Sequence, residues 1–231
     1  MSFRRRVLSA LPAVALTALV SAGCGLLGDD DPHPGFVPVP QAEGSLKPGF
    51  WNPSDPPTPE ATLTPSPGSW EDMRPKPGYR VALVVDGVSS TTSAETTALR
   101  AGVTSWAESV EAEVTEFVVT EHDGYVVQIQ GAIDAEPDLV ISVGDGLVDP
   151  MALVTASNLE TEFLIVGAEI AEPTENVTAA DWTGAAFRGE GLGKPDSYDP
   201  TSFTPERIGR AVRAGVAAVL HSITGIVVWV D

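Results

Sequence analysis

The sequence predicts an α/β protein in which a mostly parallel sheet lies between two layers of helices. From residue 79 to residue 231, short apolar runs rich in β-branched residues alternate with segments of helical length. Runs of this kind are typical of parallel strands that are buried on both faces. Parallel strands need crossover connections, so we expect helices on both faces of the sheet. This part of the chain is long enough for one core.

The first strand is expected at Arg80 to Asp86, followed by a polar loop from Gly87 to Ser93. A helix should come next, because Thr92 and Glu95 form a capping box three residues apart. The apolar residues of this segment recur at helical spacing and predict one buried stripe. The stripe contains Leu99, Val103, Trp106 and Val110.

The same alternation continues to the end of the chain. The later strands are expected at Val114 to Val119, Asp138 to Gly144, Phe163 to Gly167, Val177 to Phe187 and Ile226 to Val230. Helices are expected at Tyr125 to Ile133 and Leu147 to Asn158. Thr204 and Pro205 suit the cap and first position of a last helix. Its predicted stripe contains Ile208, Val212, Val216 and Val219.

The N-terminus has the pattern of a bacterial lipoprotein signal. Arg4 to Arg6 form a positive segment, Val7 to Val20 form an apolar core too short for a stable transmembrane helix, and Ala22-Gly23-Cys24 follows. Cys24 is the single cysteine of the chain. The sequence therefore predicts removal of residues 1–23 and lipidation of Cys24, which anchors the protein to the cell membrane on its extracytoplasmic face.

Residues 24–78 are expected to form a proline-rich, disordered tether. Thirteen of the 20 prolines lie between Gly28 and Arg80, without apolar periodicity. Such chain is extended and semi-rigid, and it would hold the domain away from the lipid head groups. The alternative is that part of it, at Phe50-Trp51 or Trp70, packs on the domain.

The charge of the chain excludes one class of partner. The formal net charge is −19, from 32 acidic and 13 basic residues. Because an acidic surface repels phosphate backbones, nucleic acid is not expected to bind. A single cysteine also excludes an intramolecular disulfide, so the fold depends on its core.

Several of these segments resemble the first lobe of the basic membrane protein (BMP) family. The matching segments are Val81 to Gly87, Ala101-Gly102, Glu136 to Gly144, Phe163 to Val166 and Asn176-Val177. The resemblance implies a type I periplasmic-binding fold and the role of a lipoprotein solute-binding component of an ABC transporter, several of which bind purine nucleosides. It covers roughly residues 79–190, which predicts a single periplasmic-binding-protein-like lobe.

The sequence departs from the family at its ligand positions. Family members that bind nucleosides carry an aspartate and a Phe-Asn pair after the first strand, where this chain has Thr92, Glu95 and Thr96. The aspartate that commonly ends their fourth strand is replaced by Gly167. The folded part also has half the length of the two-lobed proteins. A nucleoside ligand is therefore disfavoured, and a lone lobe would need a second chain or a second copy to close on a ligand.

Ligands of doubly wound sheets bind beyond the carboxyl ends of the strands, where the strand order reverses. This rule selects two loops as a candidate site for a small polar ligand. The candidate residues are Asp86, Ser89, Ser90, Thr91, Thr92, Asp145 and Gly146. The alternative is structural: Asp86 ends a strand, Thr92 caps a helix, and Asp145 belongs to a turn near a helix N-terminus.

No catalytic pattern is evident in the sequence. His33, His122 and His221 have no reason to converge, and the motifs of zinc proteases and serine hydrolases are missing. Gly144-Asp145-Gly146 and Gly191 to Lys194 lack the glycines of nucleotide-binding loops. We expect no enzyme activity, cofactor or metal. Two roles remain: a reduced, BMP-like solute-binding lipoprotein, or an envelope scaffold lipoprotein that contacts other proteins.

Overall fold

The computed structural model describes residues 42–88, 94–185 and 197–231, and their main feature is a sheet of seven strands that all run parallel. The strand order is β2-β9-β8-β7-β6-β4-β5. The strands span Thr62–Leu63 (β2), Arg80–Asp86 (β4), Glu113–Val119 (β5), Leu139–Val143 (β6), Phe163–Val166 (β7), Val177–Asp181 (β8) and Val227–Trp229 (β9). The predicted α/β class with a parallel sheet is confirmed.

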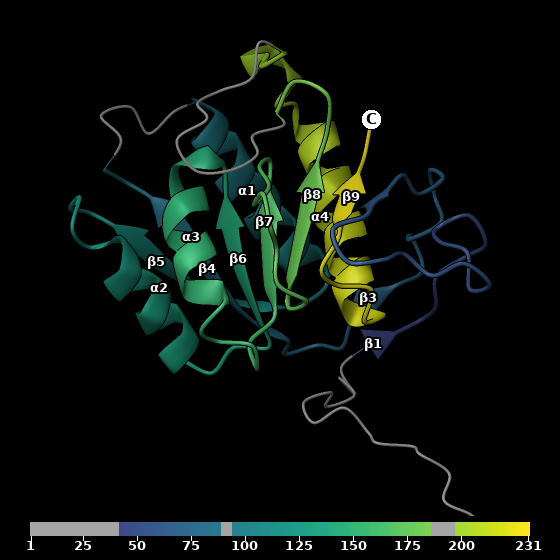
Figure 1. The fold of residues 1–231 in the computed structure, drawn as a ribbon, viewed down its shortest axis with the longest axis horizontal. Coiled ribbons are helices and arrows are strands. Elements are labelled where there is room, and N and C mark those ends of the chain that lie inside the picture. The colour runs from purple at the N-terminus through teal and green to yellow at the C-terminus, as the bar shows by residue number, and fades with distance from the viewer. Residues whose placement is uncertain (1–41, 89–93, 186–196) are drawn as a thin grey trace, which may run out of the picture. The chain divides into compact units, whose positions relative to one another are not determined.

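Helices cover both faces of the sheet, as Figure 1 shows. Helices α1 (Ala94–Ser109) and α4 (Pro205–Leu220) pack on one face, and α2 (Tyr125–Asp134) and α3 (Val148–Thr155) pack on the other. Each face has its own cluster of buried apolar side chains, because successive residues of a strand point to opposite faces. The three-layer arrangement is therefore confirmed.

The helix signals in the sequence correspond closely to the observed helices. The Thr204 hydroxyl accepts a hydrogen bond from the Arg207 N–H at 3.3 Å, and Pro205 is the first residue of α4. Leu99, Val103 and Trp106 are buried on α1 as predicted. The helix ends at Ser109, so Val110 lies just beyond it. The capping box falls partly outside the described residues, because they do not include Thr92.

Two element boundaries differ from the prediction. The expected helix from Leu147 begins as a 3-10 turn, Asp145–Leu147, and α3 then runs only to Thr155. The expected strand from Val177 to Phe187 ends at Asp181, where β8 runs out of partners.

The expected disordered tether is wrong for residues 42–78. This segment packs on the domain: β1 (Ala42–Glu43) pairs with β3 (Arg74–Pro75), and β2 adds a parallel edge strand beside β9. Phe50 and Trp70 are 1% and 4% exposed, and their rings meet edge to face with centroids 6.5 Å apart. The physical reason is that aromatic side chains between the prolines bury enough apolar surface to order the segment. Residues 24–41 lie outside the described part.

The last strand of the chain pairs inside the sheet. Val227 and Val228 of β9 pair with β8 on one side and with β2 on the other. The N-terminal segment therefore covers the edge that β9 would otherwise present to a second subunit.

Gly215 allows α4 to lie directly on the sheet. A Cβ at this position would lie 2.6 Å from Leu164 Cδ1 and 3.0 Å from Ala180 Cβ. We expect Gly215→Ala to lower the free energy of unfolding by about 1 to 3 kcal/mol, because an overpacked core must shift. Urea unfolding measures this difference.

Gly209, on the same helix, is the matched control. A Cβ there would meet only the flexible end of Arg213 at 3.4 Å. Gly209→Ala should therefore stabilise the protein by about 0.5 to 1 kcal/mol, the ordinary helix propensity gain. Equal effects of the two substitutions would contradict the close contact between α4 and the sheet.

Candidate functional site

The strand order reverses beside β4, which pairs with β5 on one side and β6 on the other. The loops that follow β4 and β6 therefore meet at the carboxyl edge of the sheet, as the sequence predicts. Asp86 ends β4, and Asp145 and Gly146 follow β6. The other four candidates, Ser89, Ser90, Thr91 and Thr92, lie outside the described residues.

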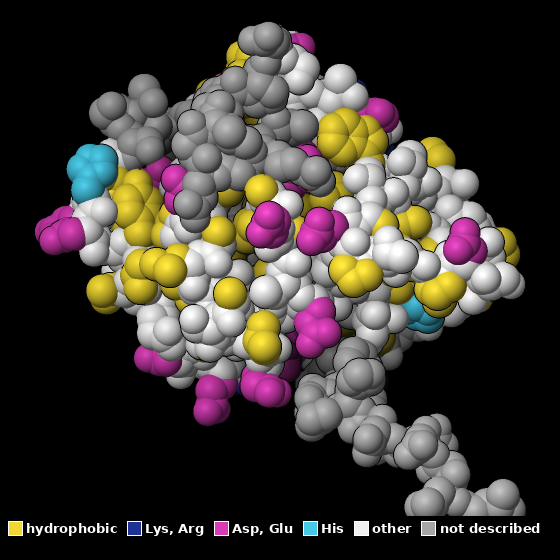
Figure 2. All heavy atoms as spheres, in the orientation of Figure 1, with side chains coloured by type: hydrophobic (Ala, Val, Ile, Leu, Met, Phe, Trp, Pro, Cys, Tyr) yellow, Lys and Arg dark blue, Asp and Glu magenta, His cyan; other side chains and the backbone are white. Residues whose placement is uncertain are grey.

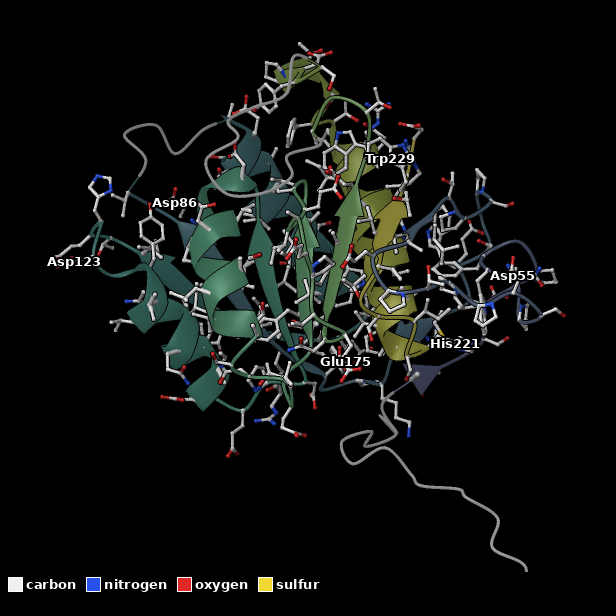
Figure 3. The ribbon with its side chains drawn as sticks, viewed as in Figure 1. Asp55, Asp86, Asp123, Glu175, His221 and Trp229 are labelled. Carbon is white, nitrogen blue, oxygen red and sulfur yellow. The ribbon has the colours of Figure 1, made fainter. Side chains whose placement is uncertain are left out.

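Asp86 is engaged in contacts that shape this edge. Its side chain is 5% exposed, and Oδ1 accepts hydrogen bonds from the Val88 N–H at 2.9 Å and the Tyr125 hydroxyl at 3.1 Å. A Cβ on Gly146 would lie 2.3 Å from Asp86 Oδ2, so the two loops touch. Figure 3 shows Asp86 beside the upper part of α3. Asp86 joins the loop after β4 to the start of α2, which favours the structural alternative for this residue.

A small pocket, with a volume of about 10 Å³ that holds roughly one water molecule, opens between the start of α1 and the ends of β6 and β7. Its lining residues are Glu95, Thr96, Leu99, Gly144, Asp145, Gly167, Tyr198 and Phe203. Gly144 and Gly167 have positive φ angles of 76° and 78°, and both lie against Leu99. These backbone conformations favour glycine and turn the chain away from the mouth of the pocket. Of the three predicted residues that the structure describes, Asp145 lines this pocket, and Asp86 and Gly146 do not.

Two aromatic residues of the pocket were missed by the sequence analysis. Tyr198 and Phe203 come from the segment before α4, and their rings lie 5.9 Å apart. The resemblance directed attention to the loop after the first strand, which lacks an aromatic residue. Here the rings reach the same edge of the sheet from a segment about 100 residues later in the chain. No sequence spacing relates them to Glu95 or Asp145.

The charged groups of the pocket are acidic. Glu95 and Asp145 both line it, and no lysine or arginine is among the described lining residues. Carboxylates and hydroxyls accept hydrogen bonds, and aromatic rings stack on apolar or cationic groups. This composition suits a ligand with hydroxyl or ammonium groups and disfavours an anion.

A buried carboxyl group lies behind the pocket. Asp181 ends β8, is fully buried, and accepts a hydrogen bond from the Trp182 N–H through Oδ1 at 2.9 Å. Burial, together with the nearby carboxyl of Glu169, raises the pKa of Asp181 to about 8, although the hydrogen bond from the Trp182 N–H acts in the opposite direction. The sequence analysis missed Asp181. An aspartate directly after the apolar run Val177 to Ala180 is the signal that would have found it.

Candidate metal ligands and histidines are dispersed in the part of the chain that the structure describes. No three histidine, cysteine or carboxylate side chains there are grouped so that they could hold a metal ion. His122 precedes α2, and His221 follows α4 and packs on Trp51 with ring centroids 5.8 Å apart. Every helix in this part is also too short or too polar to cross a membrane.

No family model matches the sequence, and no curated protein matches it either. Solved structures do resemble the fold. A fragment of a candidate lipoprotein from Peptoclostridium difficile 630 is 13% identical, with a TM-score of 0.44, and the match covers 62% of this chain and 98% of the fragment. An ABC transporter solute-binding protein from Aeropyrum pernix K1 is 19% identical, with a TM-score of 0.40, over 47% of this chain and 29% of that one.

A third similar structure is an ABC transporter solute-binding protein from Agrobacterium vitis bound to α-D-tagatopyranose. It is 19% identical, with a TM-score of 0.31, over 45% of this chain and 38% of that one. The chain thus spans less than two fifths of the length of these two solute-binding proteins. Similarities this weak concern the layered α/β architecture and not the ligand. Membership of the BMP family stays a prediction.

Proposed function

We propose that this protein is a membrane-anchored, extracytoplasmic lipoprotein that binds a small polar ligand at the carboxyl edge of a single α/β lobe, without catalysis. The observation that carries the proposal is the set of acceptor and aromatic side chains around the pocket, beside the point where the strand order reverses. The pocket itself has room for about one water molecule, so the ligand would lie over its open side. Glu95, Thr96 and Asp145 supply acceptors for hydroxyl or ammonium groups, and Tyr198 and Phe203 supply aromatic surface. A nucleoside is not favoured, because the family's base-stacking and ribose positions are not kept.

A single lobe holds a ligand from one side. Two-lobed binding proteins of the resembling family close on the ligand from both sides, so a second chain or a second copy of this one would complete the enclosure. Without it, we expect weak binding, because part of the ligand surface stays in water.

The pocket is tested by a thermal-shift screen of sugars, polyols and amines on the full-length protein in detergent. A ligand present at 100 times its dissociation constant adds about 2.7 kcal/mol of stability. We expect Asp145→Asn and Glu95→Gln to reduce this shift, since each removes a charged acceptor from the pocket.

Asp123→Asn is the matched control. Asp123 is exposed in the loop before α2, and Figure 3 shows it at the outer end of that loop, away from the centre of the sheet. The control should keep the full ligand-induced shift. A shift that survives in Asp145→Asn and Glu95→Gln would place the ligand elsewhere and contradict the proposed site.

The membrane anchor has its own test. Cys24→Ala should move the protein from the membrane fraction to an unprocessed or soluble form, because the acyl chains supply the anchoring energy. Detergent phase separation followed by immunoblotting measures the distribution. Recovery of the unaltered protein in the aqueous phase would contradict lipidation.

The scaffold role remains a second candidate because one face of the domain exposes apolar side chains. Val126 and Val127 on α2, Leu153 on α3 and Leu159 just beyond it are 43%, 69%, 65% and 52% exposed. Figure 2 shows apolar and acidic side chains together on this face. Exposed apolar clusters often mark protein contacts. If this role is correct, Val127→Ser with Leu153→Ser should abolish capture of an envelope partner, and the ligand screen should show no shifts.

A further inference from the structure

Two buried carboxyl groups, Asp181 and Glu169, lie at the carboxyl edge of the sheet; we refer to them as the carboxyl pair. Asp181 ends β8 and is 0% exposed, while Glu169 follows β7 and is 6% exposed. Asp181 Oδ2 is buried and has no hydrogen-bond partner in the described part of the chain. An ionised carboxylate oxygen is costly in such a place, so the neutral acid is the stable form of Asp181.

Both members of the carboxyl pair are connected to the pocket. Trp182 follows Asp181, donates its indole N–H to the Ser202 hydroxyl at 3.0 Å, and packs its ring on Phe203 with centroids 5.2 Å apart. Phe203 lines the pocket. Glu169 lies two residues after Gly167, which lines the same pocket. One wall of the pocket therefore adjoins each carboxyl group.

Among the described residues, the other charged groups near Asp181 do not neutralise it. Glu169, on the β7 side, is the charged group that acts on Asp181, and it disfavours ionisation. On the β9 side, the side chain of Asp231 accepts hydrogen bonds from the Thr183 N–H at 3.2 Å and the Trp229 indole at 3.0 Å. Arg207 on α4 acts on Asp231 and Asp199.

We propose that the carboxyl pair is a proton-linked latch, which holds the pocket in its described form while Asp181 is protonated and loosens it when Asp181 ionises. This regulation rests on the proposed ligand-binding function of the pocket. Ionisation places a negative charge in the interior beside the carboxyl group of Glu169, and the side chain of Asp181 then moves away or takes up water. Because Trp182 and Gly167 are the nearest connections, the Ser202 hydrogen bond and the Phe203 contact change first.

The direction in which the pKa of Asp181 is shifted decides whether the pocket loosens at acidic or at alkaline pH. The pKa of Asp181 is raised from 3.8 to about 8, so the folded protein keeps this proton at neutral pH and loses it in mildly alkaline solution. The pocket is then intact at neutral and acidic pH. Ligand affinity should fall as the pH rises through the folded-state pKa.

The experiment uses NMR to follow the indole N–H signals of the full-length protein, which is labelled with ¹⁵N-tryptophan and kept in detergent. The protein has five tryptophans, and Trp182→Phe identifies the signal of Trp182. We expect this signal to move with a midpoint near pH 8, while Asp181→Asn leaves it unchanged over the same range. Asp123→Asn, at an exposed aspartate in the loop before α2, should leave the titration as it is.

The outcomes distinguish failure of the latch from failure of the proposed ligand-binding function. A Trp182 signal that titrates in Asp181→Asn, or one that does not titrate in the unaltered protein, overturns the latch. If Asp181→Asn fails to fold, Glu169→Gln decides the question, because removing the neighbouring charge should lower the midpoint. A ligand screen without thermal shifts overturns the proposed function. The indole titration still tests the latch in that case, because it needs no ligand. Where a ligand is found, its loss of affinity at alkaline pH should disappear in Asp181→Asn.

Discussion

Replacing Phe50 by alanine should lower the free energy of unfolding by about 3 to 5 kcal/mol, the usual cost of removing a buried aromatic side chain. The ring is 1% exposed and belongs to the same apolar cluster as α1, α4 and one face of the sheet. It also packs against Trp70. Chemical denaturation followed by circular dichroism measures the loss. Trp70→Ala should act similarly.

Val127→Ala is a control for this experiment, because that side chain is 69% exposed on α2 and its truncation should change stability by less than about 0.5 kcal/mol. A Phe50→Ala protein as stable as the unaltered one would mean that residues 42–78 do not contribute to the core. Cleavage by a protease within this segment, without loss of the remaining fold, would point the same way. The described packing predicts instead that removing residues 42–78 destabilises β9 and α4.

Glu162→Gln should stabilise the protein at neutral and alkaline pH. Glu162 lies before β7, at the edge of the sheet opposite the pocket, and burial followed by the charge of Glu175 raises its pKa from 4.5 to about 7. Figure 3 shows Glu175 at this lower edge. The Oε2 atom of Glu162 is buried and has no hydrogen-bond partner among the described residues. The folded protein therefore holds a proton that the unfolded chain has already released.

This difference fixes the sign of the pH dependence. The contribution of Glu162 is fully present below about pH 4.5 and is lost as the pH rises through about 7. One pKa unit corresponds to about 1.4 kcal/mol, so after partial solvent screening the gain in Glu162→Gln at alkaline pH should be about 2 to 3 kcal/mol. Near pH 4.5 the two proteins should be about equally stable.

Thermal unfolding at several pH values measures the effect, with Glu160→Gln as the control. Glu160 is exposed two residues earlier in the same loop, so its replacement should leave the pH profile unchanged. A constant offset between Glu162→Gln and the unaltered protein at all pH values would contradict a raised pKa. The variant would then differ in packing only.

The strands and helices from residue 80 onward were predictable because each carries a local signal. The run Val81 to Val85 is apolar throughout, as a strand covered on both faces must be, and α4 has its cap and its first-turn proline in the sequence. The position of the candidate site could also be inferred. The rule that strand order reverses beside the first strand of such sheets places Asp86 and Asp145 at one edge, and the structure has them there.

By itself, the sequence determined the alternation of strands and helices, the lipoprotein signal pattern at Cys24, and the loop after β6 that borders the pocket. Only the tertiary structure decided that residues 42–78 belong to the core, that Tyr198 and Phe203 reach the pocket, and that Asp181 and Glu169 are buried together. The reason is physical. Periodicity reports which face of one element is apolar, whereas burial of an aromatic ring or of a carboxyl group depends on elements far away in the chain.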